Sequence, residues 1–145
     1  MENNLIIIPS RMESKRLPGK PLLDIEGTPM VIRVAKQAIK SNSGLVYIAC
    51  CDEEVYKTAQ NYGINVIMTN TDHSSGTDRI YEAFKNINNT ENIDTIINLQ
   101  GDMPTISSSK ISNIVKIKKT IPSDIFTLVN EINDEDEILD KDTVK

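Results

Sequence analysis

The sequence predicts an α/β fold, in which a mostly parallel β-sheet carries helices on both of its faces. Short apolar runs rich in β-branched residues alternate with longer segments whose apolar residues recur every three or four positions. Strands that alternate with helices at this spacing are joined by right-handed βαβ crossovers. The length of 145 residues is enough for one domain with a hydrophobic core.

Five segments are expected as strands because they are apolar, rich in Val and Ile, and bounded by turn residues. They are residues 5–8, 45–50, 65–68, 95–99 and 125–129. The carboxyl ends of parallel strands lie at one edge of a sheet, where ligands of open α/β folds bind. The polar loops that follow the first, third and fourth of these strands should therefore converge.

Helices are expected where apolar residues keep a helical spacing next to terminal signals. They cover residues 29–40, residues 53–62, a segment starting at Thr77 or Asp78, and a segment from residues 107–109 to before Pro122. Asp52 suits the N-cap of the second helix, and Gly63 suits its end.

The composition excludes several classes of protein. The net charge is −5, and an acidic protein is a poor general binder of nucleic acid. No stretch approaches the roughly 18 apolar residues that span a bilayer, and no signal peptide is evident, so we expect a cytoplasmic protein. The adjacent Cys50 and Cys51 are expected to be reduced thiols. Residues 130–145 are rich in Asp and Glu, and this stretch could form a loop, a frayed helix or a tail.

A basic loop follows the first expected strand, over residues 9–22. Its cations are Arg11, Lys15, Arg16 and Lys20. Arg and Lys side chains donate to phosphate oxygens, and Gly19 permits close approach of the backbone. We interpret this loop as part of a nucleotide triphosphate site. A solvated basic loop is the alternative, because the loop lacks the glycine patterns of a P-loop or a dinucleotide site.

Two further loops give weaker signals. Residues 73–79 place hydroxyl groups and a glycine before a helix, which suits hydrogen bonding to a base or ribose. Helix capping by Ser75, Thr77 or Asp78 explains the same residues. Asp102 is a candidate ligand of Mg²⁺, which is usually held by one or two carboxylates plus substrate phosphates. An Asp in a tight turn also needs no metal, so only the convergence of the loops favours a shared site.

Taken together, four motifs resemble the 3-deoxy-manno-octulosonate cytidylyltransferases, also called CMP-Kdo synthetases. The motifs are I-I-P-S-R at 7–11, S-K-R-L-P-G-K-P-L at 14–22, H-S-S-G-T-D-R at 73–79 and Q-G-D at 100–102. The enzymes that activate sialic acids share the opening pattern alone and are a weaker match. The resemblance implies a Rossmann-like nucleotidyltransferase fold, a three-layer sandwich similar to that of glycosyltransferases of type A.

The same resemblance implies a reaction, in which CMP is transferred from CTP to 3-deoxy-D-manno-octulosonate (Kdo) with release of diphosphate, for lipopolysaccharide biosynthesis. It also implies roles for individual residues. Arg11, Arg16 and Lys20 would hold the triphosphate, Ser75 and Gly76 would lie against the cytidine, Gln100 would line the site, and Asp102 would bind Mg²⁺. Arg11, Lys20 and Asp102 would be the catalytic residues, acting by positioning and charge neutralisation.

The chain departs from the family pattern in three residues and in length. Ser10 stands where Ala is usual, Cys51 where Asp is common and Met103 where Glu is common, and the last two should alter hydrogen bonding around the base or the metal. The 145 residues match a little over half of a usual member. The resemblance therefore implies an N-terminal CTP-binding part, without much of the sugar pocket, the second metal-binding Asp and most of the dimer contact.

Three hypotheses follow from this truncation. The first is an active transferase, alone or completed by a second polypeptide. The second is an inactive or marginally folded remnant of a split gene, and the third is a nucleotide-binding module without turnover. The resemblance implies a homodimer for the family, and with most of the dimer contact missing a dimer of this chain is not expected.

Overall fold

Strand β1 (Asn4–Ser10) is the centre of the fold. The computed structural model describes residues 3–13, 17–129, 131–134, 136 and 139. Within them a parallel sheet runs in the order β5-β4-β1-β6. The other three strands are β4 (Leu45–Cys50), β5 (Asn65–Met68) and β6 (Thr95–Asn98). Because β1 is paired on both edges, its carboxyl end emerges in the middle of the sheet.

Alternate residues of β1 belong to two different hydrophobic cores. Ile6 and Ile8 point to one face of the sheet, and Leu5 and Ile7 point to the other. All four side chains are fully buried. An uninterrupted apolar run is therefore required here, because a strand covered on both faces has no solvent side.

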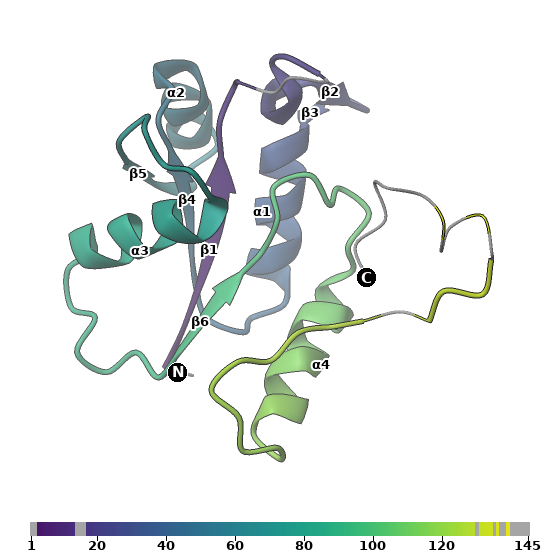
Figure 1. The fold of residues 1–145 in the computed structure, drawn as a ribbon. Helices are drawn as coiled ribbons and strands as arrows, with labels where there is room; N and C mark the ends of the chain where they lie inside the picture. Colours follow the sequence, from purple (N-terminus) through teal and green to yellow (C-terminus); the bar gives the residue numbers. More distant parts are fainter. Residues whose placement is uncertain (1–2, 14–16, 130, 135, 137–138, 140–145) are drawn as a thin grey trace.

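Helices cover both faces of the sheet (Figure 1). Helices α1 (Met30–Lys40), α2 (Glu53–Asn61) and α4 (Ser108–Lys118) pack on the face of Ile6 and Ile8. Helix α3 (Gly76–Asn86) packs on the face of Leu5 and Ile7 through Ile80 and Ala83. These three layers confirm the predicted α/β class, and the helices begin within about two residues of the expected positions.

The end of the basic loop and the segment between it and α1 contain short elements that were not among the expected strands and helices. The last residues of the loop form a single 3₁₀ turn, η1 (Lys20–Leu22). A two-stranded hairpin of β2 (Asp24–Ile25) and β3 (Thr28–Pro29) follows. The two turn residues, Glu26 and Gly27, have φ of 50° and 77°. Positive φ at both positions is the geometry of a tight type I′ hairpin turn.

The prediction of a fifth strand at residues 125–129 is wrong. The segment is irregular, and no backbone hydrogen bond joins it to β6 in the described part of the chain. Ile125 is 89% exposed and Val129 is 88% exposed. Its composition is that of a strand, but a strand also needs a partner edge, and that requirement is not visible in the local sequence.

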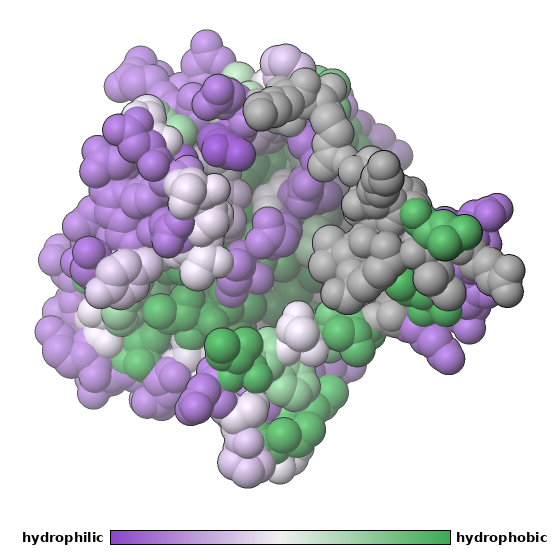
Figure 2. All heavy atoms as spheres, viewed as in Figure 1, coloured by the Kyte–Doolittle hydropathy of each residue, from purple (hydrophilic) through white to green (hydrophobic). Residues whose placement is uncertain are grey.

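The irregular segment instead lines a groove of roughly 560 Å³ beside β6 and α4. Partly exposed Ile96 and Ile97 form the β6 side of this groove. Figure 2 shows hydrophobic side chains gathered over the part of this face where β6 and α4 lie.

Two other expectations concern the end of the chain and membranes. Most of residues 130–145 lie outside the described residues, so the open alternatives for this acidic stretch stay predictions. Among the described helices, none has the length and apolar character needed to cross a bilayer.

Replacing Gly44 by alanine should destabilise the fold. An added Cβ would lie 2.3 Å from the backbone oxygen of Asn4, and neither backbone can move without disturbing β1. We expect the free energy of unfolding in urea to fall by about 2 kcal/mol or more, as for other overpacked sites. Gly27→Ala is the control: its φ is strained but its Cβ would meet no atom within 4 Å, so it should lose only about 1 kcal/mol. Equal losses in the two variants would contradict the steric explanation.

Candidate active site

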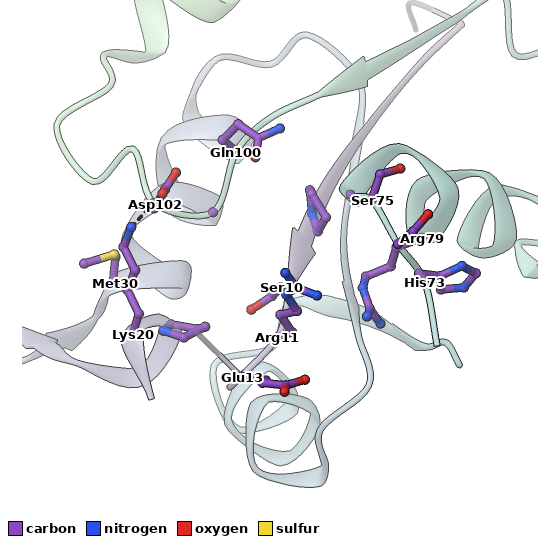
Figure 3. A pocket seen from close by; sticks show the side chains of 15 residues that line it. Ser10, Arg11, Glu13, Lys20, Met30, His73, Ser75, Arg79, Gln100 and Asp102 are labelled. Carbon is purple, nitrogen blue, oxygen red and sulfur yellow. Dashed lines mark hydrogen bonds and ion pairs between the residues drawn. The ribbon is translucent and has the colours of Figure 1, made fainter. Parts of the chain in front are cut away.

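The loops that leave the carboxyl ends of the strands enclose a cavity of roughly 540 Å³ (Figure 3). Its walls come from the end of β1, the start of η1 and α1, the loop and first turn of α3, and the turn after β6. The lining residues are Pro9, Ser10, Arg11, Glu13, Lys20, Pro21, Met30, His73, Ser74, Ser75, Gly76, Arg79, Gln100, Gly101 and Asp102. The predicted convergence of three loops is therefore confirmed.

Six of the seven predicted site residues line this cavity. They are Arg11, Lys20, Ser75, Gly76, Gln100 and Asp102. The seventh, Arg16, lies outside the described residues and stays a prediction. Their proximity is a geometric finding, and their individual roles remain to be tested.

Lys20 and Asp102 form an ion pair across the cavity. The Nζ atom of Lys20 lies 2.6 Å from Oδ2 of Asp102, although the residues are 82 positions apart in the chain. Both side chains are partly exposed, so the pair sits at the solvent side of the cavity. An exposed pair of this kind contributes about 0–1 kcal/mol, so it can open readily for a ligand.

The turn after β6 lies very close to β1. A Cβ on Gly101 would approach the backbone oxygen of Pro9 to 3.1 Å, so a larger residue would push the turn away. The neighbouring Gln100 donates through Nε2 to Oδ1 of Asn98 at 2.9 Å. The glycine therefore helps to set how near Asp102 comes to the basic loop.

The start of α3 forms part of the cavity wall through Ser75 and Gly76. Ser75 is the N-cap residue, and its hydroxyl accepts from the N–H of Asp78 at 3.1 Å. The same hydroxyl donates to the Asp78 carboxylate at 2.7 Å, and Ser74 adds a donor at 3.0 Å. These hydroxyl donors hold the pKa of Asp78 below its usual value. The capping interpretation of Ser75 is therefore confirmed, and a ligand here would meet mainly the N-terminal end of a helix, which favours anions.

Arg79 is a residue of this wall to which the sequence analysis gave no role. It is only 3% exposed. Its Nη1 donates to Oγ1 of Thr69 at 2.5 Å and to the carbonyl of Asn70 at 3.1 Å. The sequence shows an arginine at the start of a helix, which by itself does not indicate burial. Arg79 is buried because the loop that follows β5 packs over it, and this contact is not visible in the local sequence. The cavity is thus lined by three cationic side chains, Arg11, Lys20 and Arg79. It also has two carboxylates, those of Glu13 and Asp102.

Glu82 ties the loop before α3 to that helix. Its carboxylate accepts from the backbone N–H of Asn70 at 3.0 Å and from the Nδ2 group of Asn70 at 3.4 Å. It also pairs with Nε2 of His73. These donors, His73 first, hold the pKa of Glu82 below its usual value. The loop is thus held by its own helix at two side chains, Arg79 and Glu82.

The departures at Cys51 and Met103 lie outside the cavity. Cys51 donates through Sγ to Oδ2 of Asp52 at 3.4 Å, and Met103 is 44% exposed and lines the groove of β6 and α4. Both cysteines are free thiols, as expected, and burial raises the pKa of Cys50 to about 12.

Comparison with solved structures defines the class of fold. A nucleotidyl transferase from Methanothermobacter thermautotroptrophicus superposes with a TM-score of 0.66 over 78% of this chain and 56% of that chain, at 13% identity. The fold is therefore that of the nucleotidyltransferases, as the sequence predicts.

The chain belongs to the cytidylyltransferase family, whose profile matches residues 5–145. It is 42% identical over 144 residues to a 3-deoxy-manno-octulosonate cytidylyltransferase of Agrobacterium fabrum, covering 99% of this chain and 57% of that relative. A structure of a CMP:2-keto-3-deoxy-manno-octonic acid synthetase complexed with CTP is 39% identical, with a TM-score of 0.74 over 81% of this chain and 47% of that one. The chain thus spans a little over half the length of the curated relative.

The contribution of Glu82 to stability should depend on pH. Because its pKa is lowered in the folded state, the stabilisation is present above the unfolded-state value of about 4.3 and is lost as the pH falls through the folded-state value. At neutral pH, Glu82→Gln should unfold in urea with a free energy about 1 kcal/mol lower than wild type. In acid, where the wild-type carboxyl is protonated too, the two curves should coincide. A difference that stays constant from neutral to acid would show that ionisation of Glu82 does not contribute.

Proposed function

We propose that this chain is the CTP-binding part of a 3-deoxy-manno-octulosonate cytidylyltransferase, which transfers CMP from CTP to Kdo and releases diphosphate. The observation that carries the proposal is the Lys20–Asp102 pair, which closes a cation-rich cavity at the carboxyl edge of the sheet. The names of the relatives support CTP and Kdo as substrates. Mg²⁺ as cofactor, lipopolysaccharide biosynthesis as the purpose and the cytoplasm as the location complete the proposal.

The residues of the cavity would act mainly by position and charge. Arg11 and Lys20 donate to the triphosphate, and the N-terminus of α3 offers backbone N–H groups to the nucleotide. A hydroxyl of Kdo forms the new bond to the α-phosphate, and the bond from that phosphate to diphosphate breaks. Such a transfer leaves little covalent chemistry to the protein, so the rate comes from alignment and from cations that offset developing charge.

Asp102 fits a Mg²⁺ ion. Its half-exposed carboxylate is a hard oxygen donor facing the cavity. Among the described residues no cluster of three His, Cys, Asp or Glu side chains is placed to hold a metal, so the other ligands would be phosphate oxygens and water. When bound, the ion would supply charge stabilisation to the departing diphosphate.

Nucleotide binding without turnover is a second candidate. The observation that favours it is the coverage, since the chain matches only 57% of the curated relative. By the family resemblance, the remaining part carries much of the sugar pocket, a second metal-binding Asp and most of the homodimer contact.

An assay of diphosphate release separates the two candidates. The purified chain is supplied with CTP, Kdo and Mg²⁺, with and without a separately expressed polypeptide equivalent to the remaining part of the relatives. Release in either mixture supports the transferase, and CTP binding without release in both supports the second candidate. A chain that binds no CTP in either mixture contradicts both.

Lys20→Ala should weaken binding of CTP with Mg²⁺. A charge-assisted hydrogen bond to phosphate is lost, which corresponds to a rise in Kd of about 10-fold or more, measured by calorimetry. The matched control is Lys116→Ala on α4, because Lys116 is exposed and lies outside the cavity. A Kd unchanged in Lys20→Ala would remove this residue from the triphosphate site.

Asp102→Asn should separate nucleotide binding from the metal. Without metal, the wild-type carboxylate repels the triphosphate, so the variant should bind CTP in EDTA at least as tightly as wild type. Added Mg²⁺ should improve CTP binding by wild type and hardly change that of the variant. If Mg²⁺ improved binding equally in both proteins, Asp102 would not be its ligand.

A further inference from the structure

Asp52 occupies the N-cap position of α2 without capping it. Its backbone is extended there, but its side chain accepts no hydrogen bond from the first turn of the helix. A side-chain cap is worth about 1 kcal/mol, so its absence at an aspartate calls for an explanation. The carboxylate is used elsewhere: Oδ2 accepts from the backbone N–H of Met12 at 2.8 Å, across 40 positions of sequence.

A second donor fixes the same oxygen. The thiol of Cys51 donates to Oδ2 of Asp52 at 3.4 Å. Burial raises the pKa of Cys51, so this thiol keeps its proton and stays a donor. Asp52 is therefore oriented by its neighbour towards the basic loop and away from its own helix.

The contact continues from Met12 to the far end of the basic loop. The carbonyl of Met12 accepts from the N–H of Gly19 at 3.0 Å. Gly19 has a φ of 73°, a conformation that other residues rarely adopt. Lys20 follows directly and reaches Asp102. Met12 thus links two parts of the loop through its backbone: its carbonyl accepts from Gly19, and its N–H donates to Asp52.

We propose that Asp52 is a positioning residue of the nucleotide site, which through Met12 sets the places of Arg11 and Lys20. Asp52 itself does not line the cavity, so it acts on the ligand only through the loop. The ligand in this inference, a nucleoside triphosphate with Mg²⁺, rests on the proposed function. The anchor, which is the hydrogen bond from Met12 to Asp52, rests on the structure alone.

The test compares three variants with wild type. Asp52→Ala removes the acceptor, and Asp52→Asn keeps an acceptor oxygen without the charge. Glu54→Ala is the matched control, because it removes one carboxylate from the exposed first turn of α2, two residues after Asp52, without touching the loop. Exchange of the Met12 and Gly19 amide protons is followed by NMR, and the Kd is measured for CTP and for inorganic tripolyphosphate, each with Mg²⁺.

We expect exchange at both amides to rise about tenfold in Asp52→Ala, and the Kd for both ligands to rise by a similar factor. Asp52→Asn should keep most of the protection and affinity, and Glu54→Ala should match wild type in both. Because Asp52→Asn keeps the acceptor, the anchor stays testable even where Asp52→Ala is poorly folded.

Two results would overturn the inference. One is amide protection at Met12 that survives in Asp52→Ala. The other is lost protection together with unchanged affinity for both ligands, which would leave the contact a purely structural one. Failure of wild type to bind CTP would refute the proposed function instead. In that case the amide exchange and the tripolyphosphate affinity still decide the anchor.

Discussion

The burial of β1 on both faces and its pairing on both edges determine where every loop of the site begins. A strand held in this way cannot shift along its axis without moving side chains of two cores, Ile6 and Ile8 on one face and Leu5 and Ile7 on the other. Its carboxyl end therefore delivers the basic loop to a fixed point of the sheet. Because β6 runs parallel beside it, the turn that carries Asp102 arrives at the same edge. The distance between opposite charges in the cavity is thus a consequence of strand packing.

The walls of the cavity differ in how firmly they are held. On the α3 side, buried Arg79 and partly buried Glu82 tie the preceding loop to the helix through several hydrogen bonds. On the opposite side, Lys20 and Asp102 are partly exposed and satisfy mainly each other. An exposed ion pair contributes little free energy, because water can replace each partner. Breaking buried polar contacts is costly, because the groups are left without a partner. The Lys20–Asp102 side can therefore open for a ligand at little cost, while the α3 side keeps its shape.

The local sequence pattern was sufficient to predict most strands and helices. It was insufficient to predict most side-chain contacts around the cavity. The strands of the sheet and helix α1 were predictable because burial on one or two faces leaves a periodic trace in the sequence. Residues 125–129 have the same composition but no paired edge, and the hairpin of β2 and β3 is too short to leave a period. The motifs located six residues of the cavity through family resemblance. The partners of Asp52, Arg79 and Glu82 are side chains or peptides brought together by the fold, and no spacing in the sequence reports them.

The departure at position 51 is compatible with the basic loop because of what the thiol adds. A carboxylate there would lie beside the carboxylate of Asp52, and repulsion would oppose the orientation that reaches Met12. Cys51 instead donates to Asp52 and, with its pKa raised by burial, brings no charge. Arg79, whose guanidinium lies near this thiol, donates through Nη1 to Thr69 and Asn70. The basic loop therefore keeps its contact with Asp52 although residue 51 is a cysteine, and the loss of an acidic group at this position leaves that contact in place.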